Sequence, residues 1–292
     1  MKFRFLMIVL VLWFGTASCS TRSDSAGSTQ ANATYIQNKG SDTMVNLALA
    51  WAERYQQEHP QVSLSVTGGG SGTGLAALIN NTVDIANASR QIKKEEADKA
   101  KANGLNPQQF VVAKDAIAVI VNPNNPVKEL TLQQISMIYK GLINNWDEVG
   151  GEHRPIVRLS RETNSGTHVY FLESVIRLGN SKDKSIFSSD TLLLPSSEGI
   201  IAEVSDNPNA IGYDGLGYIT ASVKMVAIAK ETGKAYVLPS SATVLNGSYP
   251  VSRDLYMYTG LPPVGAVKDY LDWVKTPEAQ KIVSDLGFVP VK

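Results

Sequence analysis

Glycines and hydroxyl residues crowd into one short stretch of the chain, residues 67–74, which reads Thr-Gly-Gly-Gly-Ser-Gly-Thr-Gly. An alternating run at residues 62–66 predicts a strand before it, and the apolar spacing at residues 75–83 predicts a helix after it. Free backbone N–H groups at a helix start attract anions, and Ser71 and Thr73 add hydroxyl donors. The stretch therefore predicts an anion site, with an ordinary capped glycine turn as the alternative.

Two familiar nucleotide-binding loops are excluded by spacing. The G-x-G-x-x-G pattern fails from all three possible starts, because Thr73, Leu75 and Ala77 stand where its last glycine is required. The Walker A pattern fails because Leu75 stands where that loop needs a lysine. The sequence therefore argues against a nucleotide site.

The same arrangement, a strand followed by a polar turn and a helix start, occurs twice more. Ser-Asp-Thr at residues 41–43 precedes a predicted helix at 45–58, and Arg161 precedes Ser-Gly-Thr at residues 165–167 before another helix. A planar guanidinium binds a tetrahedral oxyanion through two N–H groups, and the N–H groups of a helix start complete such a site. Helix capping is again the alternative, but the repetition strengthens the prediction of an anion site.

Composition excludes several classes of function. The chain has 27 basic and 27 acidic residues, and removal of Lys2 and Arg4 with an N-terminal leader would leave 25 basic and 27 acidic residues. A chain with this charge balance lacks the excess of positive charge that is typical of proteins that bind nucleic acid. The three histidines are scattered and there is one cysteine, so no metal-ligand spacing is present. No Ser-His-Asp set or two-metal carboxylate cluster is visible either, so we predict no metal, no cofactor and no enzymatic activity.

The N-terminus has the pattern of an export signal. Residues 1–18 combine a basic start with an apolar run at residues 5–14, which is too short to span a membrane. Cys19 follows directly, in a segment that resembles a lipobox except that Thr16 stands where leucine is usual. We predict a lipidated Cys19 followed by a flexible tether over residues 19–33, which would anchor the protein to a membrane; plain cleavage without lipidation is the alternative.

The rest of the chain alternates between strand and helix patterns. Strands are predicted at 35–38, 62–66, 83–90, 110–112, 116–121, 156–160, 210–218 and 256–258, and helices at 45–58, 75–83, 93–102, 131–139, 167–176, 265–275 and from Thr276 onward. This alternation and the length of the exported part predict an α/β protein with two lobes and a shared cleft.

Six blocks of sequence carry a more specific resemblance. They lie, in order, at residues 40–43, 68–90, 161–167, 211–218, 252–256 and 276–281. Together they resemble the phosphate-binding proteins of ABC-type phosphate importers, the PstS family, over nearly the whole exported chain. The resemblance implies a type II periplasmic-binding-protein fold, in which two crossover strands join two α/β lobes around a central ligand cleft. The predicted first lobe spans residues 34–113 plus 226–292, and the predicted second lobe spans residues 114–225.

The resemblance also implies which residues bind the ligand. Phosphate contacts are expected from Ser41, Thr43, Met44, Ser71, Arg90, Arg161, Ser165, Gly166 and Thr167. Arg161 would be the charged clamp. Several family members carry, at the position of Arg90, an aspartate that accepts the proton of hydrogen phosphate and so disfavours sulfate. Asp42 is the preferred candidate for that acceptor here, and Asp84 is the other.

The function implied is that of an extracytoplasmic solute-binding lipoprotein, either periplasmic or at the cell surface. It would capture inorganic phosphate between its lobes and deliver it to an ABC permease, as a monomer held at the membrane only by its lipid. The alternatives are a receptor or sensor for another tetrahedral oxyanion such as sulfate, and a hydrolase of phosphate esters.

Overall fold

The computed structural model describes residues 34–291, so the predicted signal peptide, tether and lipid anchor at Cys19 lie outside the described residues. The strands are β1 (Thr34–Gly40), β2 (Val62–Thr67), β3 (Ile85–Ala88), β4 (Gln108–Val121), β5 (Glu129–Thr131), β6 (Val157–Arg161), β7 (Leu192–Leu194), β8 (Ala210–Gly215), β9 (Lys224–Met225), β10 (Ala227–Ala229) and β11 (Ser252–Thr259). A nine-stranded sheet has the order β2-β1-β3-β11-β4-β8-β6-β7, with β9 paired to β4, and β10 pairs with β5 in a separate two-stranded sheet.

The helices follow the capping signals of the sequence. They are η1 (Asp42–Met44), α1 (Val45–Glu58), α2 (Ser71–Ile79), α3 (Lys94–Ala102), α4 (Leu132–Tyr139), η2 (Trp146–Val149), α5 (Gly166–Phe171), η3 (Leu172–Ile176), α6 (Ser197–Asp206), η4 (Leu216–Tyr218), α7 (Ser241–Leu245), α8 (Gly265–Trp273) and α9 (Pro277–Asp285). Thr131 caps α4 by accepting the N–H of Gln134, and Thr276 caps α9. No helix within residues 34–291 is both long enough and apolar enough to cross a membrane.

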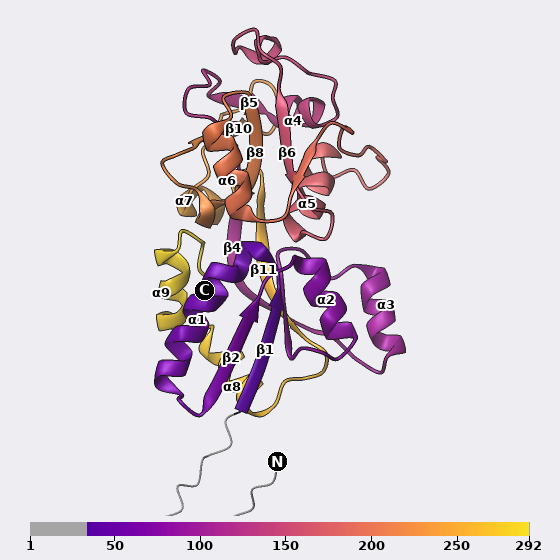
Figure 1. The fold of residues 1–292 in the computed structure, drawn as a ribbon, viewed down its shortest axis with the longest axis vertical. Coiled ribbons are helices and arrows are strands. Elements are labelled where there is room, and N and C mark those ends of the chain that lie inside the picture. The colour runs from indigo at the N-terminus through magenta and orange to yellow at the C-terminus, as the bar shows by residue number, and fades with distance from the viewer. Residues whose placement is uncertain (1–33, 292) are drawn as a thin grey trace, which may run out of the picture. The chain divides into compact units, whose positions relative to one another are not determined.

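Strands β1, β2 and β3 are parallel, so their carboxyl ends lie at one edge of the sheet. Helices α1 and α2 begin just after β1 and β2, at that same edge (Figure 1). The predicted apolar face of α1 is buried through Leu47, Trp51 and Tyr55. The Trp51 ring N–H donates to the carbonyl of Ala279, 2.8 Å away, which ties α1 to α9. Burial of these side chains fixes where the polar turn before α1 lies.

A second core includes Ile211 and Tyr213 of β8, a strand that is parallel to β6. It contains Ile135, Trp146, Phe171 and Tyr213, all fully or almost fully buried. The rings of Phe171 and Tyr213 stack with their centroids 3.6 Å apart and their planes 2° from parallel. This packing holds α5 against the sheet at the end of β6.

Strands β4 and β11 connect the two groups of elements (Figure 1). The sequence predicted two strands at 110–112 and 116–121, but the structure has the single long strand β4. Its first part pairs with β11, and from Ile117 onward it pairs with β8. The chain returns beside it, since the N–H of Ile117 donates to the carbonyl of Val251 at 2.9 Å. The two crossings are therefore hydrogen-bonded neighbours.

The lobe boundary at residue 226, predicted from the sequence, differs from this arrangement. Strand β10 pairs with β5, and Val244 and Val251 are buried in the same core as Ile135. Residues 226–251 therefore pack with the second group of elements, because their apolar side chains are buried there. We propose a first lobe of residues 34–116 and 252–291, and a second lobe of residues 117–251.

Candidate functional site

The three predicted polar turns meet at one point. The hydroxyl oxygens of Thr43 and Thr167, from opposite lobes, lie 2.8 Å apart and both residues are buried. Ser71 lies against the third turn so closely that a Cβ added at Gly166 would be 2.3 Å from the Ser71 hydroxyl oxygen. The starts of α1, α2 and α5 therefore come together, each fed by the carboxyl end of a strand.

A second serine, Ser89, joins the contribution of the first lobe. Its backbone N–H donates to the Ser71 hydroxyl oxygen at 3.0 Å, and the two hydroxyl oxygens are 3.3 Å apart. Ser41 and Met44 belong to the same lobe. The N–H of Met44 donates to the carbonyl of Ser41, the N–H of Ser41 donates to the carbonyl of Asn87, and the Met44 side chain is in the core.

The turn of the second lobe is ordered by its own cap. The Ser165 hydroxyl oxygen accepts the N–H groups of Thr167 and His168, at 3.2 and 3.5 Å. Burial lowers the pKa of His168 to about 4, and its Nδ1 lies 3.0 Å from the hydroxyl of Ser160. The imidazole next to the site is therefore neutral at neutral pH, because its charged form would be poorly solvated.

The glycine turn packs directly on the second lobe. The N–H of Gly72 donates to the carbonyl of Asn164 at 2.9 Å, and the Asn164 side-chain amide donates to the carbonyl of Gly69 at 2.9 Å. Gly70 has φ +90°, and a Cβ there would lie 2.8 Å from the carbonyl oxygen of Asn164. Glycine is required at this position by both the backbone angle and the close contact between lobes.

Arg161, the predicted clamp, hydrogen-bonds to several acceptors of the protein. Its Nη2 donates to a carboxylate oxygen of Asp42 and to the carbonyl of Pro195, both at 2.8 Å, and its Nη1 donates to the hydroxyl of Ser197 at 2.8 Å. Its Nε donates to the carbonyl of Leu194 at 3.3 Å. The guanidinium is buried, so nearly all of its donor capacity is used by protein acceptors.

Arg90, at the position of the family aspartate, pairs with Glu96 through two hydrogen bonds of 2.8 and 2.6 Å. Burial raises the pKa of Glu96, but the hydrogen bonds from Arg90 and from the N–H of Lys93 outweigh it and hold that pKa below its usual value. The Nε of Arg90 is buried and has no partner in the described residues. Arg90 is therefore not in contact with the hydroxyl cluster but keeps one free donor.

Sequence reasoning missed Arg253. Its Nη2 lies 2.9 Å from the hydroxyl oxygen of Thr167 and 3.4 Å from that of Thr43, so it reaches the point where the two lobes meet. The same nitrogen donates to the Asp115 carboxylate at 3.0 Å, and Nη1 donates to the carbonyl of Ser89 at 2.9 Å. Burial raises the pKa of Asp115, and Arg253 opposes that rise. The available signal was an arginine at an inward position of a strand pattern.

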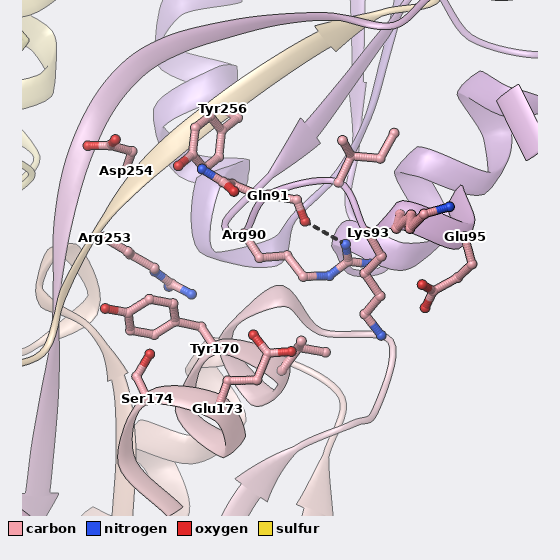
Figure 2. A pocket seen from close by; sticks show the side chains of 13 residues that line it. Arg90, Gln91, Lys93, Glu95, Tyr170, Glu173, Ser174, Arg253, Asp254 and Tyr256 are labelled. Atoms are coloured by element: carbon pink, nitrogen blue, oxygen red, sulfur yellow. Dashed lines mark hydrogen bonds between the residues drawn. The ribbon is translucent and has the colours of Figure 1, made fainter. Parts of the chain in front are cut away.

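A cavity of about 600 Å³ is lined by Arg253 and Arg90, but not by Thr43, Ser71 or Thr167. Figure 2 shows Arg253 and Arg90 among the side chains that line it, with Tyr170 below Arg253. The Cζ of Arg253 lies 5.7 Å from the centre of the Tyr170 ring, a geometry that favours the cation. Arg161 is not among the residues that line this cavity.

Another buried carboxylate, that of Asp214, lies next to the Arg161 guanidinium. One of its oxygens accepts the hydroxyl of Ser197 and the N–H of Gly215, and the other lies 3.7 Å from the Arg161 Nη1. Burial raises the pKa of Asp214 to about 6, against the opposing effect of Arg161. In the described part of the chain, no group of three or more His, Cys, Asp or Glu residues is placed to hold a metal ion.

Comparison with known proteins gives one consistent result. Residues 25–278 match the model of the PBP superfamily domain. The chain is 34% identical to the phosphate-binding protein PstS of Pseudomonas aeruginosa, over 88% of this chain and 83% of that protein. It is 32% identical to PstS of Bacillus subtilis, over 98% of this chain and 91% of that protein. A candidate phosphate ABC transporter substrate-binding protein from Clostridium perfringens, solved with bound phosphate, superimposes with a TM-score of 0.79 at 33% identity, over 89% of this chain and 100% of the other.

These matches confirm the resemblance read from the sequence and the predicted class of fold, a mixed α/β binding protein with two lobes. They also confirm that the family is one of substrate-binding proteins of transporters and not of enzymes. The chain belongs to the PstS family of phosphate-binding proteins, within the PBP superfamily.

Proposed function

We propose that this protein captures inorganic phosphate between its two lobes and delivers it to an ABC permease. The observation that carries the proposal is the meeting of Thr43, Ser71 and Thr167, three hydroxyl residues at three helix starts, beside a buried guanidinium. The names of the relatives from Pseudomonas aeruginosa and Bacillus subtilis support the same ligand.

The chemistry of the cluster suits a small tetrahedral oxyanion. Hydroxyl and backbone N–H donors are short and come from both lobes, so they can surround four oxygen atoms on all sides. An anion held in this way contacts both lobes only when they are together. Each contact with the ligand would therefore also favour the closed arrangement, which is the state that a permease can distinguish from the empty receptor.

The proposed donors are those predicted from the sequence, with one addition. They are Ser41, Thr43, Met44, Ser71, Arg161, Ser165, Gly166 and Thr167, together with Ser89. Arg90 also stays in the proposed set: it lines the adjacent cavity, and its buried Nε–H has no partner in the described residues.

The proton of hydrogen phosphate needs an acceptor, and Asp42 is already engaged. One of its oxygens accepts the N–H of Gly69 and the other pairs with Arg161, both at 2.8 Å. A serine or threonine hydroxyl can accept as well as donate, so we propose that the hydroxyl cluster receives the proton. Because hydroxyls can also donate to sulfate, this observation favours a second candidate function, a receptor for tetrahedral oxyanions in general.

Proteins of this family work outside the cytoplasm. We propose that Cys19 is lipidated and that residues 19–33 tether a monomeric receptor to the membrane. Metabolic labelling with a radioactive fatty acid tests the anchor: the wild type should be labelled and found with membranes, and Cys19→Ala should be neither. Light scattering of the purified protein tests the monomer.

Calorimetric titration of the protein, freed of bound anion, tests the function. Phosphate should bind tightly, and Thr167→Val should weaken binding by about 10- to 100-fold, as expected for loss of a hydrogen bond to a charged group. Thr220→Val, which removes an exposed hydroxyl, is the matched control and should bind as the wild type does. Equal binding of sulfate would favour the general oxyanion receptor, and no heat with either anion would overturn both functions.

A further inference from the structure

Asn164 joins the two lobes but is not one of the proposed phosphate donors. It lies in the turn before α5, directly before the proposed donors at residues 165–167, and its contacts go to the glycine turn (residues 68–72) and Thr73 of the first lobe. We infer that Asn164 is a latch, which holds the lobes closed over the bound anion and slows its release without contacting it. This inference rests on the proposed function.

The side-chain amide of Asn164 reaches across the boundary between the lobes. It donates to the carbonyl of Gly69 at 2.9 Å and to the hydroxyl oxygen of Thr73 at 3.3 Å. The backbone adds a third contact, since the carbonyl of Asn164 accepts the N–H of Gly72 at 2.9 Å. Asn164 therefore bonds to three residues of the first lobe, none of which is a proposed donor to phosphate.

The glycine turn has the shape that this contact requires. A Cβ added at Gly70 would lie 2.8 Å from the carbonyl oxygen of Asn164, and a Cβ added at Gly72 would lie 3.2 Å from the same oxygen. The first distance excludes a side chain, and the second leaves hardly any room for one. The missing side chains therefore allow the backbones of the two lobes to approach each other.

Three backbone N–H groups of the glycine turn already have acceptors within the protein. The pairs, at 2.8 to 2.9 Å, are Gly69 with the Asp42 carboxylate, Gly70 with the Gly40 carbonyl, and Gly72 with the Asn164 carbonyl. These groups shape the turn and bind the other lobe, so they are not available to an anion while the lobes are together. The Ser71 hydroxyl is still a proposed donor to phosphate.

The turn that carries Asn164 is ordered by bonds within its own lobe. The N–H of Ser165 donates to the carbonyl of Glu162 at 2.9 Å, and the Ser165 hydroxyl caps α5 directly after Asn164. Because these bonds do not involve the first lobe, the turn has its shape before the lobes meet. Less entropy is therefore lost when Asn164 reaches the glycine turn.

Asn164 is exposed, unlike the hydroxyl cluster. When the lobes separate, its amide and the carbonyl of Gly69 can bond to water instead, so the latch stabilises the closed state only modestly. A modest change in the fraction of closed protein still changes the apparent affinity by the same factor. An anion between the lobes cannot leave until these bonds break, so the latch should act on the rate of release.

Calorimetric and stopped-flow titrations with phosphate test the latch. Asn164→Ala should weaken equilibrium binding by about 3- to 10-fold, through faster dissociation, because the latch forms after the anion has entered. Circular dichroism should show a folded protein, since the side chain is exposed. Asn180→Ala is the matched control: it removes another exposed asparagine, whose side-chain oxygen accepts the N–H of Lys182 within the second lobe, and it should bind as the wild type does.

Thr73→Val separates a latch from a direct contact between Asn164 and the anion. This change removes one acceptor of the Asn164 amide and should weaken phosphate binding by about 2- to 3-fold. Thr73→Val combined with Asn164→Ala should be no worse than Asn164→Ala alone, because both changes remove the same contact. If Thr73→Val binds as the wild type does, or if the two losses add fully, the inference is overturned.

Two further outcomes distinguish the latch from the proposed function. If the wild type binds phosphate and Asn164→Ala releases it at the same rate, the latch is wrong although the protein remains a phosphate receptor. If the wild type itself fails to bind phosphate, the proposed function fails first, and the latch fails with it.

Discussion

The glycine turn at residues 68–72 and the Ser-Gly-Thr turn at residues 165–167 lie against each other where the lobes meet, but they are built differently. The glycine turn is shaped by its backbone: Gly70 has a positive φ and touches the backbone of Asn164. The second turn is shaped by a side chain, because the Ser165 hydroxyl accepts two backbone N–H groups. One half of the site therefore depends on the absence of side chains, and the other half depends on one side chain.

The largest effect is expected where the two turns touch. In Gly166→Ala, the new methyl group would lie 2.3 Å from the hydroxyl oxygen of Ser71 and 2.5 Å from that of Ser89. The lobes could not come together fully, so phosphate binding should weaken by about 2–3 kcal/mol while the separate lobes stay folded. Calorimetry measures the affinity, and circular dichroism checks the fold.

Gly199→Ala is the matched control for that change, since its Cβ would have an ordinary contact of 3.4 Å with the hydroxyl of Ser196. It should bind phosphate as the wild type does. If Gly166→Ala bound phosphate as tightly as the wild type, the two turns would not need to approach this closely. The difference between the glycine turn and the Ser-Gly-Thr turn would then not matter for binding.

A somewhat smaller effect is expected from the glycine turn itself. Gly70 combines φ +90° with ψ 154°, a region that only glycine adopts readily. Gly70→Ala should cost about 1–2 kcal/mol, and the loss should be visible in thermal stability without ligand as well as in phosphate affinity. If Gly70→Ala lowered only the phosphate affinity, the strain would arise only when the two lobes close. The glycine turn would then resemble the Ser-Gly-Thr turn more than the structure indicates.

Removal of the single side chain that orders the other turn should have a milder effect. Ser165→Ala should lower stability by about 1 kcal/mol, the usual cost of an N-cap, and should weaken phosphate binding as well. Ser196→Ala, which removes the cap of α6, should show the same loss of stability without the loss of binding. If the two variants have equal phosphate affinity, Ser165 is only a cap.

The smallest effect at neutral pH is expected from His168, next to the same turn. Its pKa is lowered from the usual 6.5 to about 4, so the folded state favours the neutral ring. The stabilisation is fully present above pH 6.5 and is lost as the pH falls from there towards 4. His168→Asn should flatten the fall of the melting temperature between pH 7 and pH 4.5, and His153→Asn, at an exposed site, should not.

Much of this arrangement was predictable because it is local. The helix at 45–58 was predicted with the bounds that α1 has, since its apolar residues repeat every four positions. The meeting of Thr43, Ser71 and Thr167 follows from a repeated pattern of strand, polar turn and helix. Parallel strands bring such turns to the same edge of a sheet, so the position in the sequence indicates the position in space.

The arginines were not predictable in this way. Arg161 was predicted as the clamp because it lies near the Ser-Gly-Thr turn in sequence, and its hydrogen bond to Asp42, 119 residues away, has no local signal. Arg253 reaches the site through a register with Asp115, 138 residues away. Strand register over such a distance is set by the whole sheet and leaves no local signal. For the same reason, the short strands β5 and β10 were missed, and the lobe boundary predicted at residue 226 differs from the one we propose from their pairing.

The place of β11 in the sheet has a consequence for the order in which the chain can fold as it is exported. Strand β11 lies between β3 and β4, although it comes from residues 252–259, close to the end of the chain. The first lobe therefore cannot complete its sheet until nearly the whole polypeptide has emerged. The second lobe as proposed is one uninterrupted segment, residues 117–251, so it can assemble first and bring the two ends of its segment together for β11 to pair beside β4.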